Sequence, residues 1–237
     1  MLLAFETSAK AASVALFQNE KLLGEGYQNT GLTHSQTLLT MAEYLLKNCG
    51  VTVNEITDVA VAAGPGSFTG IRIGVAAAKG LAWGKELPCW GVSTLEAMAL
   101  GLGVQDGYVL ATMDARRAQV YTALFLASNG VLTRVFEDSA IALTELKERI
   151  EKLDKPIFLV GDGSMLTYNT LKADVPALVL SPEHKMHQRA VGVGLAAFAA
   201  IARGESGDAE ALAPNYLRLS QAERERLEKT SQISGDL

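Results

Sequence analysis

Hydrophobic positions near the start of the chain follow first a period of two residues and then a period of about 3.6. Short apolar or alternating runs separated by turn residues predict a meander of three strands at residues 2–7, 12–17 and 21–27. The helical period that follows predicts an amphipathic helix over residues 35–48. Its apolar arc comprises Leu38, Leu39, Met41, Ala42, Leu45 and Leu46.

The same order of elements then occurs twice along the chain. A buried strand at 58–63, a small-residue helix from 68 to about 85, a strand at 89–92 and a helix at 94–100 complete the first set. After a Gly-rich stretch at 101–107, the second set comprises strands at 108–113, 119–126, 131–136 and 157–160 and helices at 144–153, 165–172 and 188–203. Alternating strands and helices predict an α/β fold with mixed sheets flanked by helices. We expect two lobes, residues 1–103 and 104–237, with a charged tail from about residue 221.

Composition places the chain among folded proteins and limits its contacts with nucleic acid. With 237 residues, 49% of them hydrophobic, the chain can bury a core. The net charge is −5, and residues 1–105 and 106–237 carry 6 basic against 8 acidic and 15 against 18 groups. Neither part is a basic arm, so any RNA contact requires a local patch or a partner.

The two cysteines and the N-terminus favour a soluble, cytoplasmic protein without a membrane segment. Cys49 and Cys89 form neither a disulfide framework nor a metal-ligand spacing. The opening MLLAFETSAK lacks the basic region of a signal peptide, and the apolar stretch 190–202 is too short to span a bilayer.

The most unusual local feature is the segment GPGSFTGIRIG at residues 64–74. A strand entering a Gly-rich turn and a helix can bind an anion, but this segment lacks the lysine of a P-loop and the third glycine of G-x-G-x-x-G. The following helix is apolar or small almost all round, so it must be covered on more than one side. We expect its own sheet on one side, and the helix at 35–48 or a second protein chain on the other.

Several ordered motifs resemble the TsaB (YeaZ) family of bacterial tRNA-modification proteins. Besides residues 64–74, they are LAFETS at 3–8, SVAL at 13–16, HSQTLL at 34–39, MDAR at 113–116 with QVY at 119–121, GDG at 161–163 and PNYLR at 214–218. These motifs run from residue 3 to residue 218, so the resemblance covers essentially the whole chain.

The resemblance implies a two-lobed actin/Hsp70/sugar-kinase-like (ASKHA) fold and an accessory, non-catalytic role. Members of the family form a heterodimer with TsaD, the subunit that transfers threonylcarbamoyl to adenosine 37 of tRNAs reading codons that begin with A, and TsaE joins the pair. We expect a homodimer when TsaD is absent, tRNA contact only through the complex, and no cofactor. The predicted interface on the first-lobe helices comprises Leu38, Leu39, Ala42, Leu45, Ile71, Arg72, Val75 and Lys79.

The alternative function is an ATP-dependent kinase or a metallopeptidase-like enzyme of the same fold. Glu6, Thr7 and Ser8 form a displaced version of the acidic strand-turn that holds Mg²⁺ in such kinases, so they are a possible vestigial nucleotide loop or simply a hairpin cap. No metal site is predicted, because His34 has Leu38 where a second helical ligand would stand.

Three other polar groups leave their roles open. Asp114, Arg116 and Arg117 follow an apolar strand and suit either a phosphate or TsaE contact or a solvated turn. His184 and His187 lie in a polar loop and are expected to be solvated. Gly161-Asp162-Gly163 is expected to be a turn.

Overall fold

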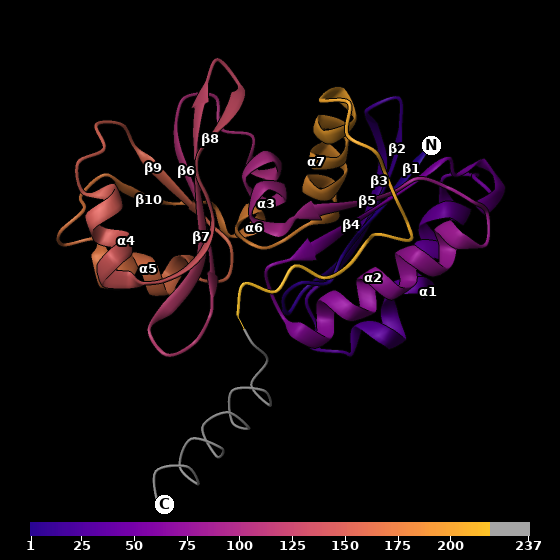
Figure 1. The fold of residues 1–237 in the computed structure, drawn as a ribbon, viewed down its shortest axis with the longest axis horizontal. Coiled ribbons are helices and arrows are strands. Elements are labelled where there is room, and N and C mark those ends of the chain that lie inside the picture. Colours follow the sequence, from indigo (N-terminus) through magenta and orange to yellow (C-terminus); the bar gives the residue numbers. More distant parts are fainter. Residues whose placement is uncertain (219–237) are drawn as a thin grey trace, which may run out of the picture.

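A computed structural model of the chain describes residues 1–218 and contains two five-stranded sheets. The first has the order β3-β2-β1-β4-β5 and comprises β1 (Leu2–Glu6), β2 (Ala12–Gln18), β3 (Lys21–Gln28), β4 (Asp58–Gly64) and β5 (Cys89–Ser93). The second has the order β10-β9-β6-β7-β8 and comprises β6 (Gly107–Asp114), β7 (Gln119–Ser128), β8 (Val131–Ala142), β9 (Ile157–Val160) and β10 (Leu178–Leu180). The two sheets lie in separate lobes (Figure 1).

Both sheets are built on the same plan, which confirms the predicted mixed sheets and the doubled pattern of elements. In the first, β1 pairs antiparallel with β2 and parallel with β4, while β3 and β5 form the edges. In the second, β6 pairs antiparallel with β7 and parallel with β9, while β8 and β10 form the edges. The central strands are β1 and β6, and the carboxyl end of each points toward the region between the lobes.

Helices cover both faces of the first sheet. The helices α1 (His34–Asn48) and α2 (Phe68–Trp83) pack on one face, where Leu3 and Phe5 of β1 contribute to a shared core. Leu2 and Ala4 point to the other face, which is covered by α7 (Ala190–Ala202) and by Ala97 of α3 (Thr94–Leu102). This alternation of side chains along β1 is why all five of its residues are buried.

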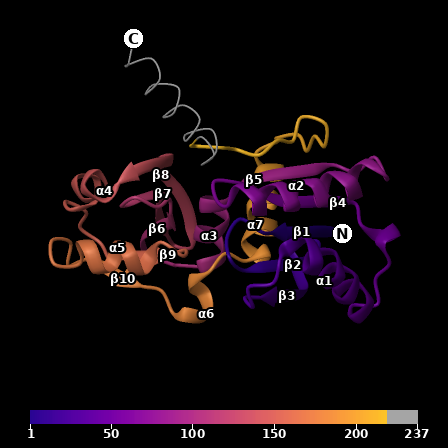
Figure 2. The same ribbon diagram turned by 90° about the horizontal axis from the view of Figure 1, so that it is seen from below.

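The second sheet is covered in the same way. The helices α4 (Leu143–Ile150) and α5 (Ser164–Leu171) lie over one face. The other face packs on Leu95 and Met98 of α3, which is thus shared by the cores of both lobes. Figure 2 shows α3 and α7 between the two sheets, with the short helix α6 (Glu183–Met186) nearby.

The helix α7 packs on the first sheet although it follows the second sheet in the sequence. The chain passes from α3 to β6 through the Gly-rich stretch, as expected, but α7 returns to pack on β1, β2 and β4 of the first sheet. Small residues permit this contact. A Cβ on Gly192 would lie 2.0 Å from the carbonyl oxygen of Ala97, and one on Gly194 would lie 2.2 Å from the Phe17 ring. Residues of α7, which lie outside the predicted first-lobe range of 1–103, therefore contribute to the core of the first sheet.

Smaller differences from the predicted elements arise where local signals are weak. β8 extends to Ala142, six residues beyond the predicted end, because it continues to pair with β7 beyond a bulge. The three-residue β10, the four-residue α6 and a 3₁₀ turn at Val53–Glu55 were not predicted, since each is too short to show a period. The predicted tail from residue 221 lies outside the described residues.

Two further expectations concern membranes and thiols. Within residues 1–218, no helix has both the length and the hydrophobicity needed to cross a bilayer. Cys49 and Cys89 are free thiols, as predicted, and burial raises the pKa of Cys89 to about 11.

Candidate functional site

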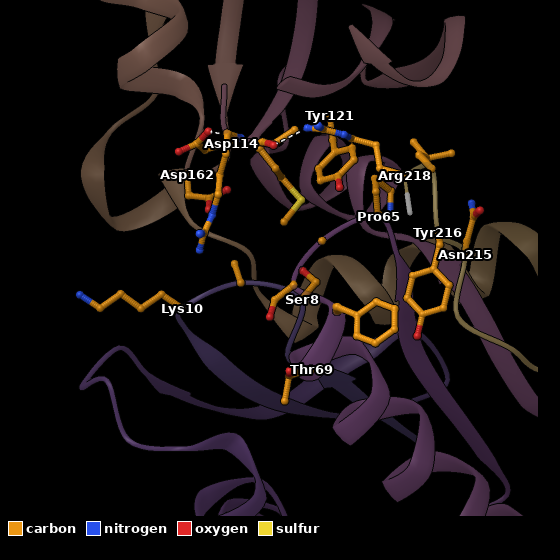
Figure 3. Close-up of a pocket in the computed structure, with 18 residues that line it drawn as sticks. Ser8, Lys10, Pro65, Thr69, Asp114, Tyr121, Asp162, Asn215, Tyr216 and Arg218 are labelled. Atoms are coloured by element: carbon orange, nitrogen blue, oxygen red, sulfur yellow. Dashed lines mark hydrogen bonds between the residues drawn. The ribbon is translucent and has the colours of Figure 1, made fainter. Parts of the chain in front are cut away.

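A cleft of about 560 Å³ lies between the two lobes, close to the predicted motifs. It is lined by the β1–β2 turn, the start of α2, the end of β6 with the turn after it, Tyr121 of β7, Asp162 after β9, and the last described residues (Figure 3). The polar lining residues include Ser8, Lys10, Ser67, Thr69, Asp114, Arg116, Tyr121, Asp162, Asn215, Tyr216 and Arg218. The fold therefore gathers five of the sequence motifs around one opening.

Glu6 turns away from this cleft. Its side chain is fully buried, its Oε1 accepts a hydrogen bond from the Ser8 amide at 2.5 Å, and its Oε2 has no partner. Burial raises the pKa of Glu6 to about 7, and the nearby Asp162 adds to the rise. Only Ser8 of the predicted vestigial loop lines the cleft, while Thr7 donates from its hydroxyl to the Gly70 carbonyl at 2.8 Å. The hairpin-cap interpretation of Glu6 fits this geometry.

The glycines of residues 64–74 bring α2 against this same turn. A Cβ on Gly66 would lie 2.4 Å from the Ser8 carbonyl oxygen, and one on Gly70 would lie 2.1 Å from that of Thr7. Ser67 caps α2 by accepting from the Gly70 amide, and its own amide donates to the Ser8 carbonyl. These two glycines therefore permit the close approach of the β1–β2 turn.

A C-terminal strap, residues 208–218, runs along the first lobe and reaches the second. Leu212 packs into the α1/α2 core beside Gly91 of the edge strand β5, and the Asn215 amide donates to the Ala63 carbonyl at 2.6 Å. At its end, Arg218 donates to the Ala115 carbonyl of the second lobe. The PNYLR motif was noted in the sequence, but the strap and its contact between lobes were not predicted.

Arg72 and Lys79, two of the predicted interface residues, hold this strap. Lys79 Nζ donates to the carbonyls of Glu210 and Leu212 at 3.1 and 3.0 Å. Arg72 donates to the Tyr216 hydroxyl at 2.8 Å, and its guanidinium lies 3.9 Å from the centre of the Phe68 ring, which stacks on Tyr216.

The other predicted interface residues divide into buried and exposed groups. Buried in the core of this chain are Leu38, Ala42, Leu45, Ile71 and Val75. These five side chains pack in the core between the helices and the sheet, so little or none of their surface is accessible in this chain, and their predicted role at an interface stays a prediction. Leu39, in contrast, is 60% exposed on α1. The outward surface of the two helices also carries Tyr44 and Trp83, 68% and 83% exposed, which the sequence analysis did not select.

The second-lobe side of the cleft is a tight turn after β6. Arg116, Arg117 and Ala118 have left-handed φ values of 62°, 55° and 54°, which L-residues adopt at a cost of about 1–2 kcal/mol each. The Asp114 carboxylate stabilises the turn by accepting from the Arg116 amide at 2.7 Å. Asp162 accepts from Gln188, and partial desolvation in the cleft raises its pKa. The DAR and GDG motifs thus meet at the cleft, as the fold implies.

The histidines do not assemble a metal site in the described part of the chain. His34 lies within hydrogen-bonding distance of the Ala9 carbonyl, 2.8 Å from Nε2, and so ties the start of α1 to the β1–β2 turn. His187 lies 3.2 Å from Glu183 on α6. Across residues 1–218, no three His, Cys, Asp or Glu residues are grouped so that they could hold a metal ion.

Comparison with known proteins covers nearly the whole chain. A family model described as "TsaD: tRNA N6-adenosine threonylcarbamoyltransferase" matches residues 28–226. The tRNA threonylcarbamoyladenosine biosynthesis protein TsaB of Bacillus subtilis is 32% identical over 231 residues, which are 96% of this chain and 98% of that protein. The structure of YeaZ from Pseudomonas aeruginosa is 28% identical and matches with a TM-score of 0.73 over 91% of this chain and 99% of YeaZ.

A more distant structure supports the fold alone. The activator of 2-hydroxyisocaproyl-CoA dehydratase from Clostridium difficile is 11% identical, with a TM-score of 0.50 over 86% of this chain and 96% of that protein. Together with the two mixed sheets, this likeness confirms the predicted two-lobed actin/Hsp70/sugar-kinase-like fold. By its match to TsaB over 98% of that protein, supported by the likeness to YeaZ, the chain belongs to the TsaB (YeaZ) family.

Proposed function

We propose that this chain acts in tRNA threonylcarbamoyladenosine biosynthesis as a non-catalytic partner subunit. The observation that carries the proposal is its alignment with a TsaB named for that process over 98% of the relative's length. In this proposal the chain pairs with TsaD, recruits TsaE to the pair in the cytoplasm, and forms a homodimer through the same face when TsaD is absent.

The outward face of α1 and α2 supports pairing through these helices. The two helices lie side by side on the first lobe (Figure 1) and contact each other. Leu39 and Tyr44 on α1 and Trp83 on α2 expose large apolar side chains there. Single exposed apolar residues are common, and the proposal assigns these three, on two adjacent helices, to an interaction surface. Since the five buried residues hold the helices on the sheet, they act by positioning this face.

The conformation of Glu6 supports the accessory role over the kinase alternative. A kinase of this fold needs a carboxylate at this position to face its ligand, whereas Glu6 bonds to its own turn and does not line the cleft. Its raised pKa also leaves it partly protonated near pH 7, which weakens any hold on a cation.

The proposal is tested by reconstituting threonylcarbamoyl transfer to tRNA with purified TsaD and TsaE, ATP and an activated threonylcarbamoyl compound as the donor. Omission of this chain is expected to abolish transfer, and its restoration is expected to recover it. Transfer at an undiminished rate without the chain would refute the proposed function.

Pairing is tested separately by co-purification of TsaD with single variants of this chain. Leu39→Glu places a charge in the proposed interface and is expected to reduce recovered TsaD at least about tenfold. Leu22→Glu, at a 41% exposed position on β3, is the matched control and is expected to recover TsaD normally. Equal recovery with both variants would exclude the α1/α2 face as the contact.

A further inference from the structure

Unpaired arginines gather around the cleft between the lobes. Residues 1–218 contain eight arginines. Four of them form ion pairs with carboxylates: Arg134, Arg149, Arg189 and Arg203. Within the same residues, Arg72, Arg116 and Arg218 have no carboxylate partner; Arg116 and Arg218 line the cleft, and Arg72 on α2 donates to Tyr216 of the strap. These three arginines without a carboxylate partner thus lie close to one cleft on an acidic protein.

Cationic side chains from three separate segments lie at the opening of this cleft. Lys10 comes from the β1–β2 turn, Arg116 from the turn after β6, and Arg218 from the end of the strap. Figure 3 shows Lys10 and Arg218 on opposite sides of the opening. The backbone around Arg116 adopts its three left-handed residues in succession, so the fold maintains this turn despite its conformational cost.

Aromatic rings accompany these cations. Tyr121 lines the cleft, and Tyr216 lies at its edge, 39% exposed, with its ring stacked on Phe68 at a centroid distance of 4.6 Å. A groove that combines cationic side chains with aromatic rings is typical of surfaces that bind single-stranded nucleic acid, because the cations contact phosphates and the rings stack on bases.

We propose that the mouth of the interlobe cleft, formed by Lys10, Arg116, Tyr121, Tyr216 and Arg218, binds the backbone of RNA. The inference rests on the proposed function, since tRNA is the RNA that threonylcarbamoyladenosine biosynthesis brings to the chain. On this proposal the cleft mouth is the local cationic patch that an acidic chain needs for contact with RNA. The chain would then contact tRNA itself, and not only through other subunits.

Two carboxylates in the cleft limit where a phosphate can bind. Asp114 and Asp162 line the same cavity and would repel a phosphate placed beside them. Asp114 accepts from the Arg116 amide and Asp162 accepts from Gln188, so both are held by the second lobe. This arrangement fits a strand that crosses the opening from Lys10 to Arg218 better than a phosphate inserted between the two carboxylates.

The test compares two double variants that remove the same charge. Lys10→Gln with Arg116→Gln removes two cations from the cleft mouth. Lys21→Gln with Lys152→Gln removes two exposed lysines on β3 and after α4 that form no ion pair in the described part of the chain. Arg218 is left intact because it bonds to Ala115. Equal thermal unfolding of both variants shows that the fold is retained.

Binding is measured by fluorescence anisotropy with an unmodified transcript of a tRNA that reads codons beginning with A, over a range of salt. The full chain is used alone and in complex with TsaD. Loss of two phosphate contacts is expected to weaken binding about tenfold at 0.1 M salt and to reduce the salt slope by about 1.4 to 1.8. The control variant is expected to bind as the unmodified chain does.

Equal binding by both variants, or equal weakening in both, would overturn the proposal. It would also be overturned if the cleft variant lost TsaD in co-purification while binding RNA normally, because the cations would then dock an acidic protein. The transfer assay keeps the two proposals separate. Unchanged RNA binding by the cleft variant in a transfer-competent complex removes only this inference, whereas transfer without the chain removes only the proposed function.

Discussion

The buried carboxyl of Glu6 makes the stability of this protein depend on pH near neutrality. The side chain is fully buried at the carboxyl end of β1, and one carboxyl oxygen has no hydrogen-bond partner. Substitution Glu6→Gln keeps the size of the group and the acceptor for the Ser8 amide, but it removes the charge. The variant therefore isolates the cost of holding an ionised group at this position.

The magnitude follows from the pKa in the two states. Burial raises the pKa of Glu6 from 4.5 to about 7 in the folded chain. Below pH 4.5 both states are protonated and the folded state loses nothing. Between pH 4.5 and 7 the unfolded chain gives up its proton first, so stability falls as pH rises, by about 3 kcal/mol in total. Above pH 7 the loss is constant.

The assay is urea unfolding of the unmodified chain and of Glu6→Gln at intervals from pH 4.5 to 8.5. We expect similar unfolding free energies near pH 4.5 and a stability advantage for Glu6→Gln that grows to about 3 kcal/mol by pH 8. Glu43→Gln, at an exposed position on α1, controls for the change in net charge. A difference between Glu6→Gln and the unmodified chain that stays constant across this range would refute the reasoning.

Two further predictions test the packing of the first lobe. Val75→Glu buries an unpaired charge in the α1/α2 core and is expected to lower the free energy of unfolding by at least about 3 kcal/mol, whereas Leu39→Glu should change it by less than about 0.5 kcal/mol in urea titrations. Equal effects would contradict the assignment of buried and exposed positions. Gly192→Ala places a Cβ against the Ala97 carbonyl and is expected to lower the free energy of unfolding by about 1–3 kcal/mol, measured by thermal unfolding. Ala199→Gly on the same helix controls for helix propensity. An unchanged stability of Gly192→Ala would contradict the contact between α7 and α3.

The interface hypothesis shows where the helical pattern is informative and where it fails. The periodicity of α1 correctly marks an apolar arc, and the sheet covers that arc through Leu38, Ala42 and Leu45. Hydrophobicity alone cannot distinguish an arc that packs on the chain's own sheet from one that awaits a partner. Of the residues that project outward, Leu39 lies in the predicted apolar arc, whereas Tyr44 and Trp83 were not selected by the pattern.

Local sequence by itself determined most strands, the main helices and the doubled order of elements, because the side-chain periods of strands and helices are short-range properties. It also supplied the motifs that identify the family. Tertiary structure decided how distant segments meet. The helix α7 packs on the first sheet, and Arg72 and Lys79 bind a strap more than 130 residues away in the sequence. The Glu6 side chain accepts a hydrogen bond within the β1–β2 turn to which it belongs. Tertiary structure also placed Lys10, Arg116 and Arg218 around one cleft, since such contacts depend on three-dimensional packing between segments that share no local pattern.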